Sequence, residues 1–132
     1  MAGLTKRDRR CWLVNAYAPQ GTTMRDANDA WNEYVADTAR GPLLFHDHFA
    51  DTPGGTALFA PDTEAELAAV KDLRPVADWD VRIHPLIFAE GALGFLFQCD
   101  YTMIGYRKRR LPDLFAKYMA SDAGKKNAAR EL

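Results

Sequence analysis

The sequence predicts a mixed α+β domain in which four strands and two helices follow the order β-α-β-β-α-β. Three observations support this prediction: short segments of period-two alternation, longer segments with an apolar stripe at helical spacing, and Gly- or Pro-containing breaks between them. The chain has 132 residues, of which 48% are hydrophobic and 27% are charged. Its length suits one domain of about 150 residues, and its composition excludes general disorder.

The first strand is expected over residues 11–18, an apolar segment rich in β-forming side chains. Residues 23–39 predict the first helix, with Thr23 and Asp26 resembling a capping box at its start. Five side chains of this segment, most of them apolar, recur on one helical face: Ala27, Trp31, Tyr34, Val35 and Thr38.

Residues 43–50 and 56–60 predict two strands joined by the turn sequence Thr-Pro-Gly-Gly at 52–55, and therefore a hairpin. The second helix is expected to start at residues 61–63, because Thr63 and Glu66 form a capping box. Its buried stripe is expected to consist of Leu67, Val70 and Leu73.

Residues 79–88 predict the fourth strand, in which Pro85 indicates an edge position or a bulge. The resulting order is that of ferredoxin-like domains. Both helices are expected on one face of the antiparallel sheet, so the opposite face needs a cover. We therefore expect a homodimer in which two sheets close face to face as a dimeric α+β barrel.

Residues 91–132 form a C-terminal extension to this domain, which spans residues 11–90. Apolar or aromatic side chains alternate with polar ones over residues 95–103, which favours a fifth strand; a helix that uses Leu93, Phe97, Ile104 and Leu111 remains the alternative. Residues 112–119 predict a short helix, and the polar tail from Ser121 is expected to fray. The extension is expected to pack on its own domain or on the dimer partner.

Charge and composition argue against several classes of protein. The net charge of −1 does not suit a dedicated nucleic-acid binder, and the basic run at 107–110 reads as a solvated linker. No apolar run reaches the roughly 18 residues that span a bilayer, and no signal-peptide pattern is present. Two cysteines, Cys11 and Cys99, are too few for a disulfide framework. A cytoplasmic protein without membrane or nucleic-acid partners is expected.

Several segments resemble the YciI-like (YCII-related) family: GPLL at 41–44, Asp47, the glycine pair at 54–55, EAEL at 64–67 and DVRIHP at 80–85. The resemblance covers about residues 11–88. It implies a dimeric α+β barrel, from a superfamily that includes small monooxygenases, isomerases and dehalogenating enzymes. A His on the first helix and an Asp after the Gly-Pro-Leu stretch have been proposed as that family's catalytic pair. The resemblance assigns the Asp to Asp47, whereas this first helix has no His: Arg25, Asp26, Asn28 and Asp29 occupy the stretch.

The segment FHDHF at 45–49 carries the main candidate site residues. Side chains alternate along a strand, so His46 and His48 are expected on one face and Asp47 on the other. Two imidazoles at this spacing can reach one ion, so a divalent metal on the two histidines is possible, although no other cofactor is expected.

A second set of candidates lies on the first and fourth predicted strands. Arg82 and His84 share a face of the fourth strand, and Asn15 and Tyr17 share the more polar face of the first. In a face-to-face dimer, His46 and His48 are expected beside Arg82 and His84 of a second copy. Asn15 and Tyr17 are then expected to form the floor of the pocket.

These residue types suit acid/base chemistry on a small organic molecule. His46 or His48 would act as the acid or base, with Asp47 in the same catalytic set, and Arg82 would bind an anion. Tyr17 would orient a carbonyl, and Asn15 and His84 would bind substrate. The expected function is an isomerase, lyase, hydrolase or cofactor-free oxygenase; the alternative is a non-catalytic dimeric ligand-binding or accessory protein.

Overall fold

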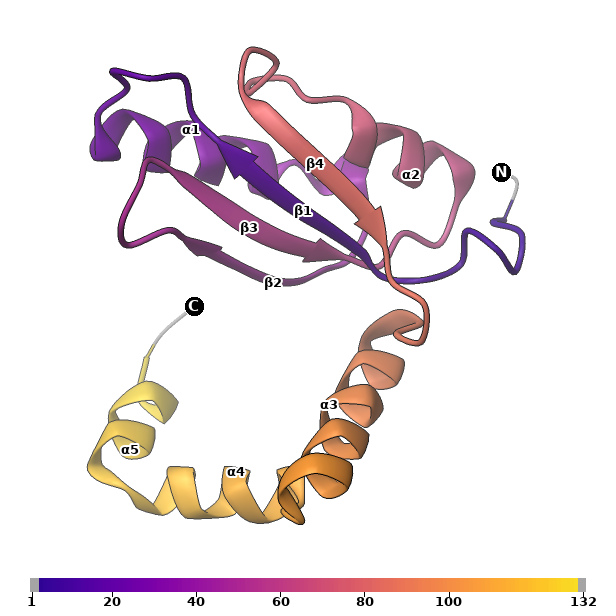
Figure 1. The fold of residues 1–132 in the computed structure, drawn as a ribbon, viewed down its shortest axis with the longest axis vertical. Helices are drawn as coiled ribbons and strands as arrows, with labels where there is room; N and C mark the ends of the chain where they lie inside the picture. Colours follow the sequence, from indigo (N-terminus) through magenta and orange to yellow (C-terminus); the bar gives the residue numbers. More distant parts are fainter. Residues whose placement is uncertain (1–2, 131–132) are drawn as a thin grey trace.

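A computed structural model describes residues 3–130 and has the mixed α+β architecture that the sequence predicts. Four strands form one antiparallel sheet in the order β2-β3-β1-β4 (Figure 1). The strands are β1 (Trp12–Tyr17), β2 (Leu43–His48), β3 (Gly54–Phe59) and β4 (Asp80–Pro85). The connecting helices are α1 (Met24–Ala36), the short 3-10 helix η1 (Thr38–Arg40) and α2 (Glu64–Lys71). Pro85 lies on an edge strand, as predicted.

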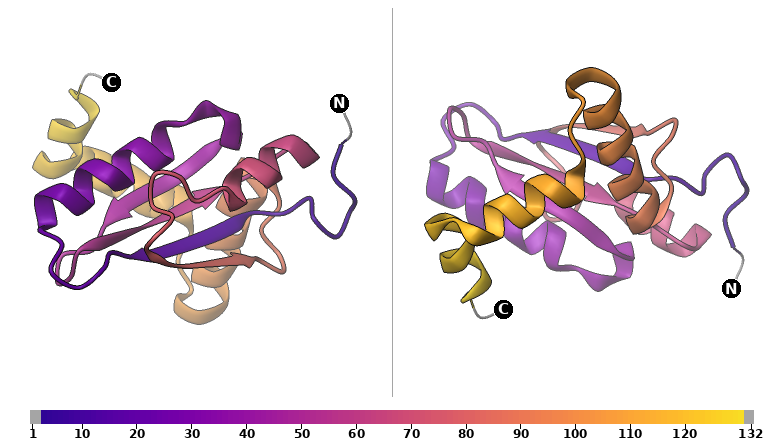
Figure 2. Two further views of the ribbon diagram at one scale, coloured as in Figure 1. Left: turned by 90° about the horizontal axis from the view of Figure 1, so that it is seen from above. Right: turned by 90° about the horizontal axis from the view of Figure 1, so that it is seen from below.

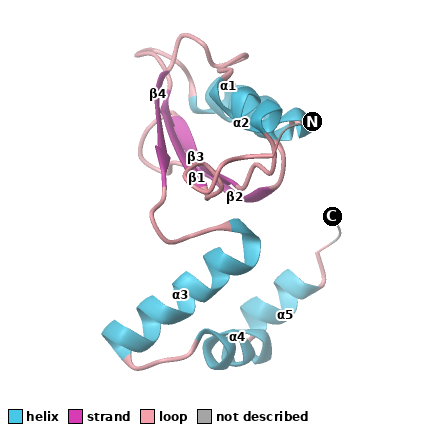
Figure 3. Cartoon of the chain, turned by 90° about the vertical axis from the view of Figure 1, so that its right-hand side faces the viewer, coloured by secondary structure: helices cyan, strands magenta, loops and turns pink. Residues whose placement is uncertain are grey.

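The helices α1 and α2 cover one face of the sheet (Figure 2, Figure 3). The core lies between these helices and the sheet. Its centre is Trp31, which stacks on Tyr34 with ring centroids 4.9 Å apart. The Tyr34 hydroxyl donates to the carbonyl of Val70 at 2.6 Å, which joins α1 to α2. The larger apolar core lies on this face and stabilises the domain, whereas most of the opposite face of the sheet has no helix layer.

Side-chain caps start both helices, as the sequence predicts. The Asp26 N–H donates to Thr23 Oγ1, and the Glu66 N–H donates to Thr63 Oγ1, each at 3.1 Å. Glu66 Oε1 also accepts from the Asp62 N–H at 2.8 Å. The two bonds to Thr23 and Thr63 satisfy N–H groups that the first turn of a helix leaves without partners, and the bond from Asp62 fixes the chain just before α2.

Gly54 and Gly55 form the start of β3, so their prediction as turn residues is wrong. A Cβ atom at Gly55 would lie 2.4 Å from the Trp31 ring. Trp31 also donates from Nε1 to the carbonyl of Thr56 at 3.2 Å. The glycine is therefore required by the close approach of α1 to the sheet rather than by a turn.

Beyond β4 the chain forms three helices, α3 (Gly91–Arg107), α4 (Leu111–Ala120) and α5 (Asp122–Ala128), which we call the C-terminal arm. The predicted strand over 95–103 is therefore wrong, and the helical alternative is correct. Leu86 N–H donates to the Cys11 carbonyl and Cys11 N–H to the Ala89 carbonyl, after which the chain leaves the sheet. A segment with no neighbouring strand pairs its backbone polar groups internally, as a helix.

The rest of the arm is also helical. The short helix predicted over 112–119 is confirmed as α4. The expected fraying from Ser121 is wrong for α5, because Ser121 Oγ caps this helix by accepting from the Gly124 N–H at 3.1 Å. Residues 131–132 lie outside the described residues.

The arm lies on the side of the sheet opposite α1 and α2 (Figure 2, Figure 3). Its first helix is attached through Phe95, which packs against a small buried cluster that includes Cys11, Leu58 and Ala89. Among residues 3–130, no helix combines the length and the apolar character needed to cross a membrane.

Candidate functional site

A row of four polar side chains crosses the face of the sheet that α1 and α2 leave bare. The strand register places Asp47 opposite Thr56, Thr56 opposite Asn15, and Asn15 opposite Arg82. Residues directly opposite each other in antiparallel strands point to the same side of the sheet. We call these four residues the polar row; adjacent strands lie about 4.8 Å apart, so the row spans about 14 Å.

The residues that flank the polar row along each strand show on which face of the sheet its side chains lie. Val14 and Ala16 flank Asn15 and are fully buried in the core beneath α1, as is Ala57 beside Thr56. Because side chains alternate along a strand, Asn15 and Thr56 must point away from that core. The polar row therefore belongs to the bare face.

The centre of the polar row is ordered by a hydrogen bond. Thr56 Oγ1 donates to Asn15 Oδ1 at 2.8 Å, which directs the side-chain amide of Asn15 and leaves its N–H₂ group as a donor. At the β4 end, Arg82 forms an ion pair with Asp80, with 3.6 Å between Nη2 and Oδ2. The Arg82 side chain is 69% exposed, so its guanidinium remains accessible to an anion.

Less polar side chains lie on both sides of the polar row. On one side, Tyr17 stacks on Phe49 with ring centroids 5.2 Å apart. On the other side, the register places Leu13 opposite Leu58 and opposite His84. Both flanking rows are mixed, since Asp80 lies opposite Tyr17 and His84 lies opposite Leu13. His84 shares the face with Arg82, two residues away on β4, as predicted.

His46 and His48 do not lie on this face. The register pairs His46 with Ala57 and His48 with Gly55, whose missing side chain would point at Trp31. Both imidazoles therefore lie on the face that α1 covers, at the β2 edge. The expectation that they share a pocket with Asn15 and Tyr17 is wrong. A register irregularity between Leu43 and Phe45 contributes, because one extra residue reverses the faces of the residues beyond it.

The alternation within the His-Asp-His segment is confirmed, since Asp47 alone of the three belongs to the bare face. The rings of His46 and His48 have centroids 5.9 Å apart at an interplanar angle of 81°. His84 lies at the opposite edge of the sheet, on β4. Within the described part of the chain, no group of three or more His, Cys, Asp or Glu side chains is arranged to hold a metal ion. A metal on the two β2 histidines stays a prediction.

Thr56 is the site residue that the sequence analysis missed. Thr56 lies within the predicted hairpin, and threonine is a common residue in strands, so the sequence gives no sign of a functional role. Only the pairing with Asn15 identifies it as part of the polar row.

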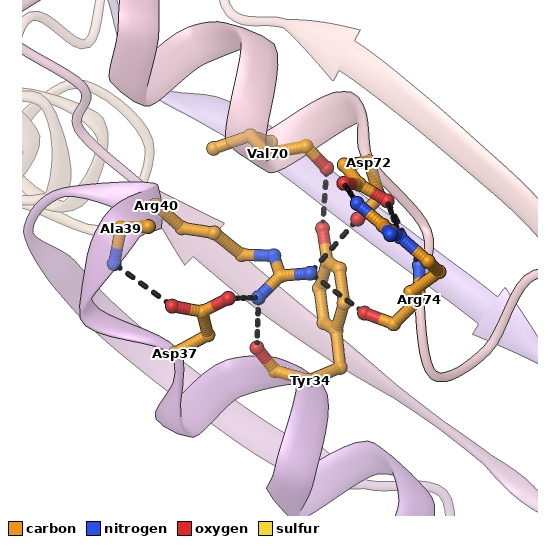
Figure 4. A network of polar contacts seen from close by, with 7 residues as sticks. All are labelled: Tyr34, Asp37, Ala39, Arg40, Val70, Asp72 and Arg74. Carbon is orange, nitrogen blue, oxygen red and sulfur yellow. Dashed lines mark hydrogen bonds and ion pairs between the residues drawn. The ribbon is translucent and has the colours of Figure 1, made fainter.

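A second polar cluster surrounds Arg40 and has a structural role (Figure 4). The Arg40 side chain is buried and lies over the Tyr34 ring, 3.9 Å from its centroid. Its guanidinium donates to the carbonyls of Tyr34, Asp72 and Arg74 at 2.8–2.9 Å, and it pairs with Asp37 Oδ2 at 2.9 Å. All these acceptors belong to the protein, so the cluster joins the ends of α1 and α2.

Cys11 is a structural residue as well. Burial raises the pKa of its thiol, and its Sγ donates to the carbonyl of Gly91 at 3.5 Å. A thiol held in the protonated form is a poor nucleophile. Cys11 therefore contributes to the attachment of the arm rather than to chemistry.

Comparisons of the chain with protein-family models, with curated proteins and with solved structures find no match. A guanidinium at one end, an ordered amide–hydroxyl pair in the centre and a carboxylate at the other end suit a small polar ligand that carries a negative charge.

Proposed function

We propose that the protein is a ferredoxin-like, homodimeric α+β barrel of the YciI type that binds a small organic carboxylate on the bare face of the sheet and moves a proton on it. The observation that carries this proposal is the polar row, in which Arg82 and the hydrogen-bonded Asn15–Thr56 pair share one face. Polar groups of this kind, fixed on regular strands with aromatic and aliphatic side chains nearby, are typical of a site that orients a ligand.

Arg82 is the anion-binding group in this proposal. Its planar guanidinium can bind a carboxylate through two parallel hydrogen bonds, in exchange for its exposed ion pair with Asp80. The free N–H₂ group of Asn15 and the hydroxyl of Tyr17 are donors for a neighbouring carbonyl. Asp47 at the far end of the polar row limits the charge and length of the ligand.

His84 replaces the β2 histidines as the general base. It lies on the same face of β4 as Arg82, about 7 Å along the strand, which is within reach of a carbon next to a bound carboxylate or carbonyl. The imidazole would take a C–H proton while the electron pair moves to the carbonyl oxygen, where Asn15 and Tyr17 stabilise the enolate by hydrogen bonds. Return of the proton to another atom would complete an isomerisation.

A second copy supplies the cover that this site requires. The bare face has no helix layer of its own, and a sheet packed face to face on another sheet buries the residues between them. Exclusion of water would strengthen the hydrogen bonds to the ligand.

Ligand binding tests the role of Arg82. Titration calorimetry with pyruvate, phenylpyruvate and benzoate is expected to detect binding of at least one of these carboxylates. Arg82→Gln should then raise the dissociation constant about tenfold or more, because a charged hydrogen bond is worth about 1.5–3 kcal/mol. Arg74→Gln is the matched control, since Arg74 is also exposed and paired with an aspartate but lies outside the bare face. Equal loss in the two variants would contradict the proposal.

Proton exchange tests the role of His84. In D₂O, the protein is expected to accelerate deuterium incorporation at the carbon next to the carbonyl of the pyruvate-type ligand, as measured by NMR. His84→Gln should reduce this rate about 100-fold or more, the usual contribution of a general base, while binding persists. His46→Gln serves as the control and should leave the exchange rate unchanged. Binding without any exchange would instead favour the non-catalytic ligand-binding protein.

A further inference from the structure

The C-terminal arm exposes an unusual amount of apolar surface. The helices α3 and α4 have no buried residue, although both are rich in large apolar side chains. On α3, Phe97 is 74% exposed, Tyr101 72% and Tyr106 75%. Leu93, Leu96 and Ile104 add further exposed apolar positions around the same helix. A helix that is apolar on all sides is typical of a buried position, not of a free surface.

The arm also contains a preformed groove between α3 and α4, with a volume of about 500 Å³. Its lining is largely apolar: Leu93, Leu96, Phe97, Leu111, Pro112 and Phe115. Asp100 and Arg110, which also line it, form an ion pair at 3.2 Å, and Asp100 accepts from the Leu111 N–H at 2.7 Å. The angle between the two helices is thus held by polar contacts while the apolar groove stays open.

The exposed area is large enough for a stable interface. Five aromatic side chains of the arm and of the link before it are 62–75% exposed: Phe88, Phe97, Tyr101, Tyr106 and Phe115. An aromatic side chain can bury about 150–250 Å², so these five alone present about 500–900 Å². A standard protein interface buries about 800 Å² on each partner.

Charge indicates which surface the arm contacts. Residues 11–90 carry 13 acidic and 5 basic side chains, a net charge of −8, whereas residues 91–132 carry 4 acidic and 8 basic side chains, a net charge of +4. The arm is therefore complementary to the sheet domain of this same chain. On the bare face itself, the two carboxylates of Asp47 and Asp80 outnumber the one guanidinium of Arg82.

We infer that the arm of each copy packs along the edge of the bare face of a second copy, beside the two paired sheets, so that two chains exchange their arms. The arm already lies on the bare-face side of its own sheet (Figure 2), where it meets a copy that approaches this face. The exchange buries the aromatic side chains of the arm and places its basic residues beside the acidic residues of the partner. The inference rests on the homodimer of the proposed function, but it requires neither a ligand nor a reaction.

Apolar-to-acidic variants test the arm surface. Sedimentation equilibrium is expected to show a dimer, and Phe97→Glu and Phe115→Glu should each raise its dissociation constant at least about tenfold, as for residues at the centre of an interface. Met24→Glu, which makes the same kind of change at an exposed position on α1, is the control and should leave the dimer intact. Circular dichroism verifies that each variant remains folded. A monomer in the unaltered protein, or a dimer insensitive to both arm variants, would overturn the inference.

Isotope-mixed cross-linking tests the exchange. Unlabelled and ¹⁵N-labelled chains are mixed at a dilution that dissociates the dimer, concentrated, and treated with a carbodiimide that joins lysines to contacting carboxylates. Links from Lys117, Lys125 or Lys126 to Asp47, Asp51 or Asp80 are expected to include pairs that combine both labels. Links between same-label peptides alone would show that each arm folds on its own sheet, and would refute the exchange. If no carboxylate binds the unaltered protein while mixed-label links are present, the proposed site is overturned and the exchange of arms stands.

Discussion

Arg40 shows how one buried charge can join three segments of a chain. Its side chain is 2% exposed, the lowest exposure of any charged residue that the structure describes. The carbonyls that it binds terminate α1 and follow α2, where helix ends lack internal partners. Burial raises the pKa of the adjacent Tyr34 hydroxyl, although the positive charge of Arg40 opposes this shift.

Replacement of Arg40 is expected to destabilise the fold strongly. Arg40→Ala leaves the carbonyls of Asp72 and Arg74 without the guanidinium donor and removes the shorter of two bonds to the Tyr34 carbonyl, so the free energy of unfolding should fall by about 3–5 kcal/mol in urea denaturation. Arg74→Ala removes an exposed arginine of the same neighbourhood and should cost much less. Similar losses for the two variants, measured at one protein concentration, would show that the Arg40 cluster contributes no more than a surface ion pair.

At the scale of the element, the connection between α3 and α4 depends on Asp100. The backbone N–H of Leu111 and, to a smaller extent, the Arg110 guanidinium lower the pKa of this carboxyl below its ordinary value of 3.8. A carboxyl whose pKa is lowered by folding stabilises the folded arrangement above its unfolded-state pKa. This stabilisation is lost as the pH falls through the lower folded-state value.

The junction of α3 and α4 is therefore expected to loosen in acid. In a ¹⁵N NMR titration, the amide shift of Leu111 should follow the protonation of Asp100 with a midpoint below 3.8. Asp100→Asn should abolish this titration, while Asp113→Asn on the same arm should not affect it. A midpoint at or above 3.8 in the unaltered protein would contradict the role assigned to the Leu111 hydrogen bond.

The strands show which parts of an element are predictable from sequence. Asn15 and Tyr17 were correctly predicted to share one face, as were Arg82 and His84. The members of each pair are two residues apart, and the side-chain period of a strand is two. The face taken by His46 and His48 was not predictable, since it depends on the pairing of β2 with β3 and on the irregularity after Leu43. A shift of one residue exchanges the two faces without any change in the sequence pattern.

The arm shows that one segment can fit both a strand pattern and a helix pattern. Residues 95–103 alternate as a strand does, but they also carry apolar side chains at helical spacing. A strand needs a neighbour, and the chain leaves the sheet after Ala89, so the helix prevails. Local pattern could not decide this, because the deciding fact is that residues 95–103 pair with no strand of the sheet.

At the scale of the whole molecule, one face of the sheet is covered by a well-packed helix layer, and the other face is largely uncovered. Two helices and a sheet enclose the aromatic core around Trp31. The bare face and the arm lie on the other side (Figure 3). Together they expose polar groups and large apolar side chains. Both features have the same explanation if a second copy completes the layer, which is why the oligomeric state is the most informative property to measure.

The sequence by itself determined the α+β class, the order of strands and helices, the capping residues and the pairs of side chains that share a strand face. These properties depend on local periodicity and on backbone chemistry within a few residues. Tertiary structure alone decided that Thr56 joins Asn15, that the β2 histidines lie under α1, and that the C-terminal segment is helical. Each of these depends on register or on the presence of a neighbouring strand, and such long-range pairing leaves no periodic signal along the chain.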